Sequence, residues 1–211
     1  KVKSMLVMGE DTAHIHPNLN KINKALENLE ILITQDLFMN EIAKKSDIVF
    51  GVKSAYEKTG VYVNAMRRLH LSQPLVENDL PDDWQVLRDI ENKIEGKFLF
   101  NTSEDVWEQV RVEAPYRYGG ASYHKLMKNR ARGLQWPVAK NDTPVLHLEK
   151  FNTKDGLGKF IYNGYELRNQ VKKLIEGTKF DTFYLTTGRV LIHYNNAAQT
   201  IQTPRLKELH S

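Results

Sequence analysis

Three short apolar runs, separated by segments with helical spacing, constrain the fold of this 211-residue chain more than any other feature. The runs are residues 5–8, 31–33 and 48–50. Between the first two, apolar residues recur on one face of a helix that should begin near Pro17: Leu19, Ile22, Leu26 and Leu29. A shorter helical segment around Ile42 precedes the third run. Continuous apolar runs are typical of parallel strands buried on both faces, so the pattern predicts an α/β fold with a parallel sheet flanked by helices.

Further helices are expected between the third run and residue 132. Asp82 or Asp83 should cap a helix whose inward residues are Trp84, Leu87, Ile90 and Ile94. Thr102 and Asp105 resemble a capping box, in which two side chains satisfy free backbone N–H groups at a helix start. Another short helix is predicted over residues 122–128.

The last third of the chain reads as less regular. Residues 133–163 contain Gly, Pro and short alternating stretches, which predict a loop with hairpin-like strands. One more helix should contain Leu167, Val171, Leu174 and Ile175. It should stop at Gly177, and a final strand is expected over residues 183–185.

Composition excludes several classes of site. The chain has no Cys, which rules out disulfides, a thiolate nucleophile and cysteine-held iron–sulfur clusters within it. Its seven His are scattered without metal-ligand spacing, so no protein-ligated metal is expected. No apolar run approaches the roughly 20 residues that span a bilayer, and we expect a cytoplasmic protein. The net charge of +4 includes a cationic stretch from Lys125 to Arg132, which is either solvated surface or a patch for an anionic partner.

Polar turns follow three of the predicted strands. They are Gly9-Glu10-Asp11, Gln35-Asp36 and Thr187-Gly188-Arg189. In an open parallel sheet, ligands bind beyond the carboxyl ends of the strands. Carboxylates can accept hydrogen bonds from ribose or guanine, and an Arg fork can clamp a phosphate. The three turns suggest a nucleotide-containing ligand, although each alone could simply be a turn after a strand. Neither the Gly-x-Gly-x-x-Gly fingerprint nor a Walker A motif is present.

Several motifs in these and other segments resemble those of formate dehydrogenase catalytic subunits in the molybdopterin oxidoreductase family. The motifs are collinear and cover almost the whole chain. They are Val7-Met8-Gly9-Glu10-Asp11, Gln35-Asp36-Leu37-Phe38-Met39, Ala43 to Val49, Glu57 to Asn64 with Arg67, Asp83-Trp84, Gly133 to Pro137, Leu148 to Phe151, and Leu185 to Arg189 with His193-Tyr194.

The resemblance implies a cofactor and a set of contacts. The family holds molybdenum or tungsten in a bis-molybdopterin guanine dinucleotide. By this resemblance Asp11, Gln35 and Asp83 contact one dinucleotide, with Gly9, Glu10 and Asp36 completing the turns. Thr187, Gly188 and Arg189 approach the pterin side, and His193 lies near the metal end. Glu57, Gly60, Asn64 and Arg67 are expected to form framework around the site.

The chain also departs from the family pattern. Ile15 stands where relatives often have a hydroxyl, Gly51 replaces a common Pro, and Val63 stands where Thr is usual. The segment over residues 195–199 is less basic and has fewer hydroxyls than the resemblance leads us to expect.

The resemblance also implies that this chain is the C-terminal portion of a larger subunit. The Cys or selenocysteine ligand, the catalytic His and Arg, and the iron–sulfur cluster are then expected in an N-terminal part, so the chain alone should be inactive. Three segments are expected: 1–132 as the α/β cofactor-binding domain, 133–179 as a connection, and 180–211 as the start of a β-barrel-type dinucleotide-binding domain. Expected partners are the rest of the catalytic subunit and an electron-transfer subunit, without nucleic acid or membrane insertion. The alternative is a non-catalytic scaffold or subunit-interaction module.

Overall fold

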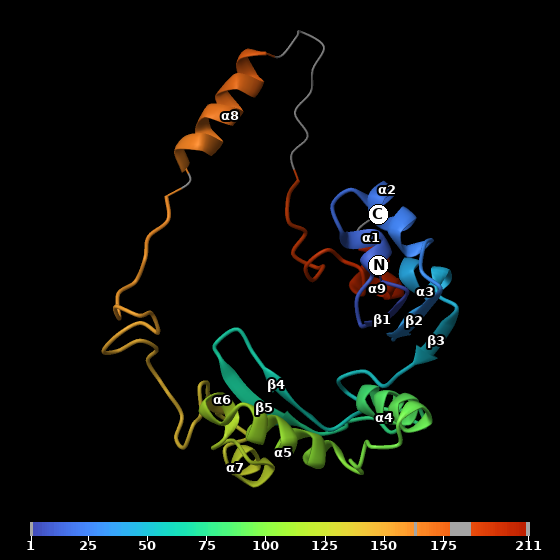
Figure 1. The fold of residues 1–211 in the computed structure, drawn as a ribbon, viewed down its shortest axis with the longest axis vertical. Coiled ribbons are helices and arrows are strands. Elements are labelled where there is room, and N and C mark those ends of the chain that lie inside the picture. Colours follow the sequence, from blue (N-terminus) through green and yellow to red (C-terminus); the bar gives the residue numbers. More distant parts are fainter. Residues whose placement is uncertain (1, 163, 178–186, 210–211) are drawn as a thin grey trace. The chain divides into compact units, whose positions relative to one another are not determined.

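The computed structural model describes residues 2–162, 164–177 and 187–209 (Figure 1). The chain divides into two compact units. One comprises residues 1–144 together with 192–211, and the other comprises residues 145–191.

The first part of the larger unit is a three-stranded parallel sheet with the strand order β1-β2-β3. Its strands are β1 (Ser4–Met8), β2 (Ile31–Asp36) and β3 (Ile48–Gly51). Helices α1 (Thr12–Ile15), α2 (Leu19–Leu26) and α3 (Glu41–Lys45) lie between them in the chain and beside them in space (Figure 1). The β-α-β-α-β pattern and the parallel sheet that the apolar runs predict are therefore confirmed.

The core of this sheet lies on one face only. Its buried residues are Val7, Ala13, Leu26, Leu32 and Ile42. When the strand order advances in one direction, right-handed crossovers put successive helices on the same face. The opposite face carries Leu6 and Ile48, which are 37% and 41% exposed. The expectation that the strands are buried on both faces is wrong for β1 and β3, because the outer strands of so small a sheet have cover on one side only. The central strand β2 is buried on both faces near its end, where Thr34 and Gln35 are both fully buried.

A second, antiparallel sheet follows, which the sequence did not predict. It consists of β4 (Gly60–Val63), β5 (Arg68–Ser72) and β6 (Leu134–Gln135), in that order. The turn between β4 and β5 is held by the side chain of Asn64, which accepts hydrogen bonds from the backbone N–H groups of Met66 and Arg68, both at 3.0 Å. Arg67 takes the left-handed conformation with φ +61°. This turn lacks the Asn-Gly or Asp-Gly pair that marks hairpins in a sequence.

Four helices accompany this sheet: α4 (Asp83–Ile94), α5 (Ser103–Glu113), α6 (Pro115–Tyr118) and α7 (Tyr123–Lys128). Residues of α5, α6 and α7 pack in or against a second core of Leu69, Ala121, Leu126, Leu134 and Val138. The predicted capping box is present, since Asp105 N donates to Thr102 Oγ1 at 3.1 Å and Thr102 N donates to Asp105 Oδ2 at 2.9 Å. Ile94 is 76% exposed, so its predicted inward position is wrong; it is the last residue of α4, beyond the packed part of the helix.

The remaining elements are α8 (Gly164–Glu176) in the smaller unit and η1 (Thr200–Gln202) and α9 (Pro204–Glu208) in the larger one. Helix α8 ends before Gly177, as expected. Of the hairpin-like strands predicted over residues 133–163, the described residues contain β6, which pairs with β5 and forms no hairpin within that range. The predicted strand over 183–185 lies outside the described residues, and the β-barrel-type domain stays a prediction. Over the described parts of the chain, no helix has the length and apolar character that crossing a membrane requires.

Candidate functional site

A cavity of about 460 Å³ opens at the carboxyl ends of β1 and β2. Three segments of the larger unit line it: the turn after β1, the turn after β2, and the loop that follows His193. The lining residues are Met8, Gly9, Glu10, Asp11, Ile15, Asp36, Phe38, Asn40, Tyr194, Asn195, Asn196, Ala198, Gln199 and Thr200. The structure thus brings four of the predicted site residues to one cavity: Gly9, Glu10, Asp11 and Asp36.

Gly9 opens the turn after β1. Its backbone N–H donates to the carbonyl oxygen of Gln35 at 2.9 Å, which ties the end of β1 to β2. Its φ is +61°, a conformation that side chains other than Gly rarely adopt. A Cβ added here would meet nothing within 4 Å. The backbone at Gly9 is therefore open to close approach by a ligand.

Asp11 is buried, at 6% exposure, and its carboxylate is already engaged. Oδ1 accepts from the backbone N–H of Ile42 at 2.9 Å, and Oδ2 accepts from that of Glu41 at 3.4 Å. These N–H groups belong to the first turn of α3, which has no intrahelical partners for them. The contacts of Asp11 therefore fix α3 against the turn after β1, which shapes one wall of the cavity.

Asp36 organises the second turn in a similar way. Its Oδ1 accepts from the backbone N–H groups of Leu37 at 2.7 Å and Phe38 at 3.3 Å. Its Oδ2 accepts from the side-chain amide of Asn40 at 2.9 Å, and Asn40 in turn accepts from Ala43 N at 3.1 Å as the N-cap of α3. Both predicted carboxylates are thus held by protein groups, and both still border the cavity.

Gln35 and Asp83 form a separate pair that does not line this cavity. Gln35 is fully buried, and its Nε2 lies 3.5 Å from the carbonyl oxygen of Asp83. Within the described residues its Oε1 is buried without a hydrogen-bond partner. The carboxylate of Asp83 bonds to Lys58 Nζ, and Asp83 lines a smaller cavity of about 270 Å³ together with Trp84 and Trp107. The sequence placed these two residues with Asp11, whereas the structure joins Gln35, near the end of β2, to Asp83, the first residue of α4.

The cavity has an acidic and amide lining. Glu10 is half exposed, with His16 Nε2 3.3 Å from its Oε1. None of the fourteen described lining residues is Lys or Arg. Carboxylates and amides accept from hydroxyl and N–H groups, but they do not neutralise a phosphate. The lining therefore suits the ribose and base of a nucleotide better than its phosphates.

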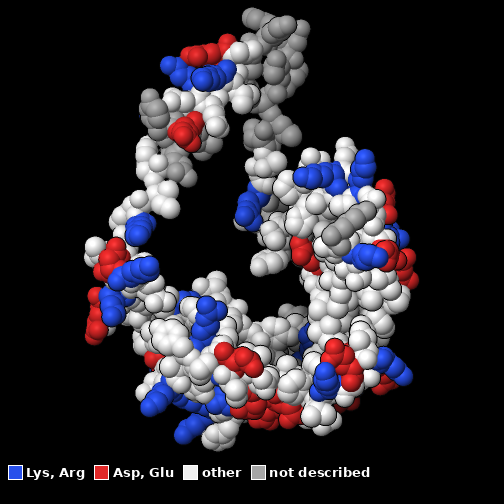
Figure 2. Space-filling view, in the orientation of Figure 1, with Lys and Arg blue, Asp and Glu red and all other residues white. Residues whose placement is uncertain are grey.

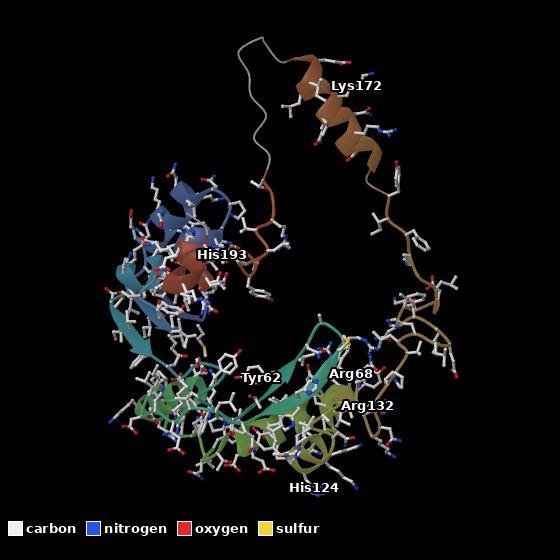
Figure 3. All side chains as sticks on the ribbon, turned by 180° about the vertical axis from the view of Figure 1, so that it is seen from behind. Tyr62, Arg68, His124, Arg132, Lys172 and His193 are labelled. Atoms are coloured by element: carbon white, nitrogen blue, oxygen red, sulfur yellow. The ribbon has the colours of Figure 1, made fainter. Side chains whose placement is uncertain are left out.

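The loop over residues 194–200 supplies the wall that the sequence interpretation did not assign. His193, labelled in Figure 3, directly precedes this loop. Its Nδ1 lies 2.8 Å from Thr200 Oγ1, which joins the two ends of the loop. Asn195 and Ala197 take positive φ values of 52° and 66°. Three amides, Asn195, Asn196 and Gln199, face the cavity from this loop. The sequence feature that could have located these amides is the His193-Tyr194 motif, which directly precedes them. After this motif the chain departs from the family pattern.

Thr187, Gly188 and Arg189 belong to the smaller unit and are exposed. Their predicted contact with the pterin side of a cofactor stays a prediction. Among the described residues, no three His, Asp or Glu side chains converge where they could hold a metal ion.

Comparison with known proteins shows what the chain is similar to. The sequence model of molybdopterin oxidoreductases matches residues 1–93. The F420-dependent formate dehydrogenase subunit alpha of Methanocaldococcus jannaschii is 31% identical over 98% of this chain and 30% of its own length. A second such alpha subunit, from Methanococcus maripaludis, is 31% identical over 99% of this chain and 31% of its own length. Among solved structures, acetylene hydratase from Pelobacter acetylenicus is 18% identical over 64% of this chain, with a TM-score of 0.49. The chain spans about a third of the length of the formate dehydrogenase subunits.

Proposed function

We propose that this chain, whose residues 1–93 belong to the molybdopterin oxidoreductase family, is the part of an oxidoreductase subunit that holds one guanine nucleotide of a molybdenum or tungsten bis-pterin cofactor. The observation that carries the proposal is the open backbone at Gly9 beside the cavity of about 460 Å³. Ligand cavities in proteins usually have volumes of about 300–1,000 Å³, and a nucleoside fits this range.

The described residues fit the nucleoside end of such a cofactor. Glu10 and the amides of the loop over 194–200 offer acceptors and donors to ribose hydroxyls and to the N–H edge of guanine. Asp11 and Asp36 hold the two turns in place, and we assign them a positioning role. Among the described residues, the Oε1 of Gln35 is a further buried acceptor without a hydrogen-bond partner.

The proposed activity of the whole enzyme is oxidation of formate to carbon dioxide, which releases one proton and two electrons. When bound, the cofactor supplies the two-electron redox chemistry, and the protein supplies binding and orientation. The residues of this chain would hold the nucleotide end and so fix where the metal end lies. Arg189, with Thr187 and Gly188, is proposed to meet the phosphates or the pterin side, since Arg forks pair with phosphate oxygens.

Calorimetric titration with guanosine, GMP and adenosine tests this assignment. Because the cavity is lined by carboxylates and amides, guanosine should bind at least as tightly as GMP and more tightly than adenosine. Gly9→Ala should weaken guanosine binding about tenfold or more, because the added methyl group occupies the open approach.

The matched control is Gly96→Ala. Gly96 also has a positive φ, of 72°, and a Cβ there would meet only Asn92 O at 3.8 Å. Both substitutions carry the same kind of backbone strain, but Gly96 does not line the cavity. Equal loss of binding in both variants, or no guanosine binding by the folded wild-type chain, would refute the assignment.

A non-catalytic scaffold is the second candidate. Ile15, which stands where relatives often have a hydroxyl, is one of the cavity-lining residues and makes part of the wall apolar. Metal analysis of the protein purified from its native host distinguishes the two functions. Stoichiometric molybdenum or tungsten is expected for the cofactor-binding role, and a metal-free, fully assembled protein is expected for the scaffold.

A further inference from the structure

One stretch of the larger unit carries a charge excess that the proposed function does not use. Residues 114–140 contain six Lys or Arg and no Asp or Glu. The six are Arg117, Lys125, Lys128, Arg130, Arg132 and Lys140. The net charge of the whole chain is only +4, so the six positive charges of this stretch exceed the net charge of the chain.

The fold brings these cations together along one backbone segment. Arg68 Nη1, from β5, donates to Arg132 O at 3.2 Å, and the two side chains lie close together in Figure 3. The guanidinium of Arg117, from α6, lies 5.9 Å from the ring centre of Trp136. Lys125 Nζ, from α7, donates to Lys140 O. Residues 132–140, which span at most about 30 Å, therefore contact cationic side chains from three other elements.

Most of this positive charge is not neutralised within the described residues. Arg68 and Lys125 donate to backbone carbonyls, which satisfy the hydrogen bonds and leave the charges uncancelled. The only carboxylate paired with these cations among the described residues is Asp142, 3.6 Å from Arg132 Nη2, and that Arg side chain is 67% exposed. An exposed pair of this kind contributes little. Figure 2 shows the resulting gathering of Lys and Arg around α7, which we call the basic surface. It comprises Arg68, Arg117, Lys125, Lys128, Arg130, Arg132 and Lys140.

Exposed apolar side chains border the basic surface. Met66, at the tip of the β4–β5 turn, is 63% exposed, and its carbonyl oxygen accepts from Gln135 Nε2 at 3.1 Å. Tyr116, next to Arg117, is 70% exposed. Protein interfaces are enriched in Arg, Met and aromatic residues, whereas contacts to a nucleic-acid backbone are made mainly to phosphate and sugar. The mixture of cations with Met and Tyr favours a protein as the partner.

We propose that the basic surface docks an acidic region of a protein partner. Charge complementarity would steer the encounter, and the bordering Met66 and Tyr116 would add apolar contact. None of the residues of this surface lines the cavity at Gly9, so docking and nucleotide binding can be tested separately.

Fluorescence anisotropy with three labelled probes of equal net charge tests the proposal on the full chain. The probes are a 20-residue peptide of Glu and Leu, a poly-glutamate of matched charge, and a short DNA duplex. The Glu–Leu peptide should bind most tightly, and raising the salt from 50 to 200 mM should weaken its binding, because screening shortens the range of the attraction.

Matched triple variants locate the binding. Lys128→Gln with Arg130→Gln and Arg132→Gln should weaken peptide binding about tenfold or more. The control, Lys21→Gln with Lys24→Gln and Lys45→Gln, removes the same charge from exposed positions on α2 and α3 and should change it less than twofold. Equal weakening by both variants would overturn the proposal in favour of net charge alone. Tightest binding of the DNA duplex would overturn it in favour of a nucleic-acid surface.

Discussion

The substitution Asp11→Ala tests the positioning role of this carboxylate most sharply. Ile42 N would lose its acceptor at 2.9 Å in a buried setting, and Glu41 N would lose a weaker one at 3.4 Å. A hydrogen bond to a charged group contributes about 1.5–3 kcal/mol, and loss of a helix cap costs about 0.5–2 kcal/mol. Because one of the two contacts is long, we expect Asp11→Ala to destabilise this part of the chain by about 2–3 kcal/mol. Asp11→Asn keeps an acceptor and should cost about 1 kcal/mol.

Urea unfolding followed by circular dichroism measures the loss, and hydrogen exchange at the Ile42 amide locates it. Asp89→Ala is the control, since Asp89 is 65% exposed and, among the described residues, its only ion pair is with its neighbour Arg88. Its cost should stay below about 0.5 kcal/mol. If Asp11→Ala is no more destabilising than Asp89→Ala, or if exchange at Ile42 is unchanged, the carboxylate does not hold α3 in place.

Three further outcomes follow from the described contacts. Gly133→Ala should lower the free energy of unfolding by well over about 2 kcal/mol, because the added Cβ would lie 2.7 Å from His70 Nε2 and 2.8 Å from Leu69 O. Gly9→Ala, where the Cβ meets open space, should lower it by about 1 kcal/mol. Equal losses in denaturant unfolding would contradict this geometry. Gln35→Leu should change the free energy of unfolding by less than about 1 kcal/mol, because it removes a buried acceptor that has no partner among the described residues. Thr34→Val should cost about 1 kcal/mol or more, because it breaks the 2.6 Å contact with Ser46 Oγ. A larger loss for Gln35→Leu than for Thr34→Val would show that the Oε1 of Gln35 is hydrogen-bonded. The hydrogen bonds from Ser54, and that from Asn78, lower the pKa of Glu57 below its ordinary value of 4.5. The stability that the ionised Glu57 contributes is therefore present above pH 4.5 and lost as the pH falls through the folded-state pKa. Glu57→Gln should flatten the acid limb of the curve of stability against pH, and an unchanged slope would contradict this role of Glu57.

The parts of the fold that depend on local pattern were predictable. The apolar runs and the intervening helical spacing predict β1, β2, β3 and their connections, because continuous runs and a 3.6-residue period are local properties. The Thr102–Asp105 box marks the start of α5 for the same reason. The β4–β5 hairpin was missed because its turn depends on the Asn64 side chain and on a left-handed Arg67, which have no strong sequence signature.

The candidate site was predictable in location and less so in the role of each residue. The position of Gly9, Glu10, Asp11 and Asp36 beside one cavity follows from the rule that parallel strands end at a common edge. The engagement of Asp11 with α3 depends on where a short helix begins, thirty residues away in the chain. The wall over residues 194–200 required a contact between distant segments, which one sequence does not reveal.

A two-dimensional NMR titration of the chain with guanosine tests the central claim most directly. The account predicts saturable shifts of the backbone amides of Gly9 and Glu10, and of the loop over 194–200, with one dissociation constant for all of them. Saturable shifts confined to other residues, such as those around Asp83 and Trp84, would contradict the claim, as would a spectrum of the folded chain that guanosine leaves unchanged.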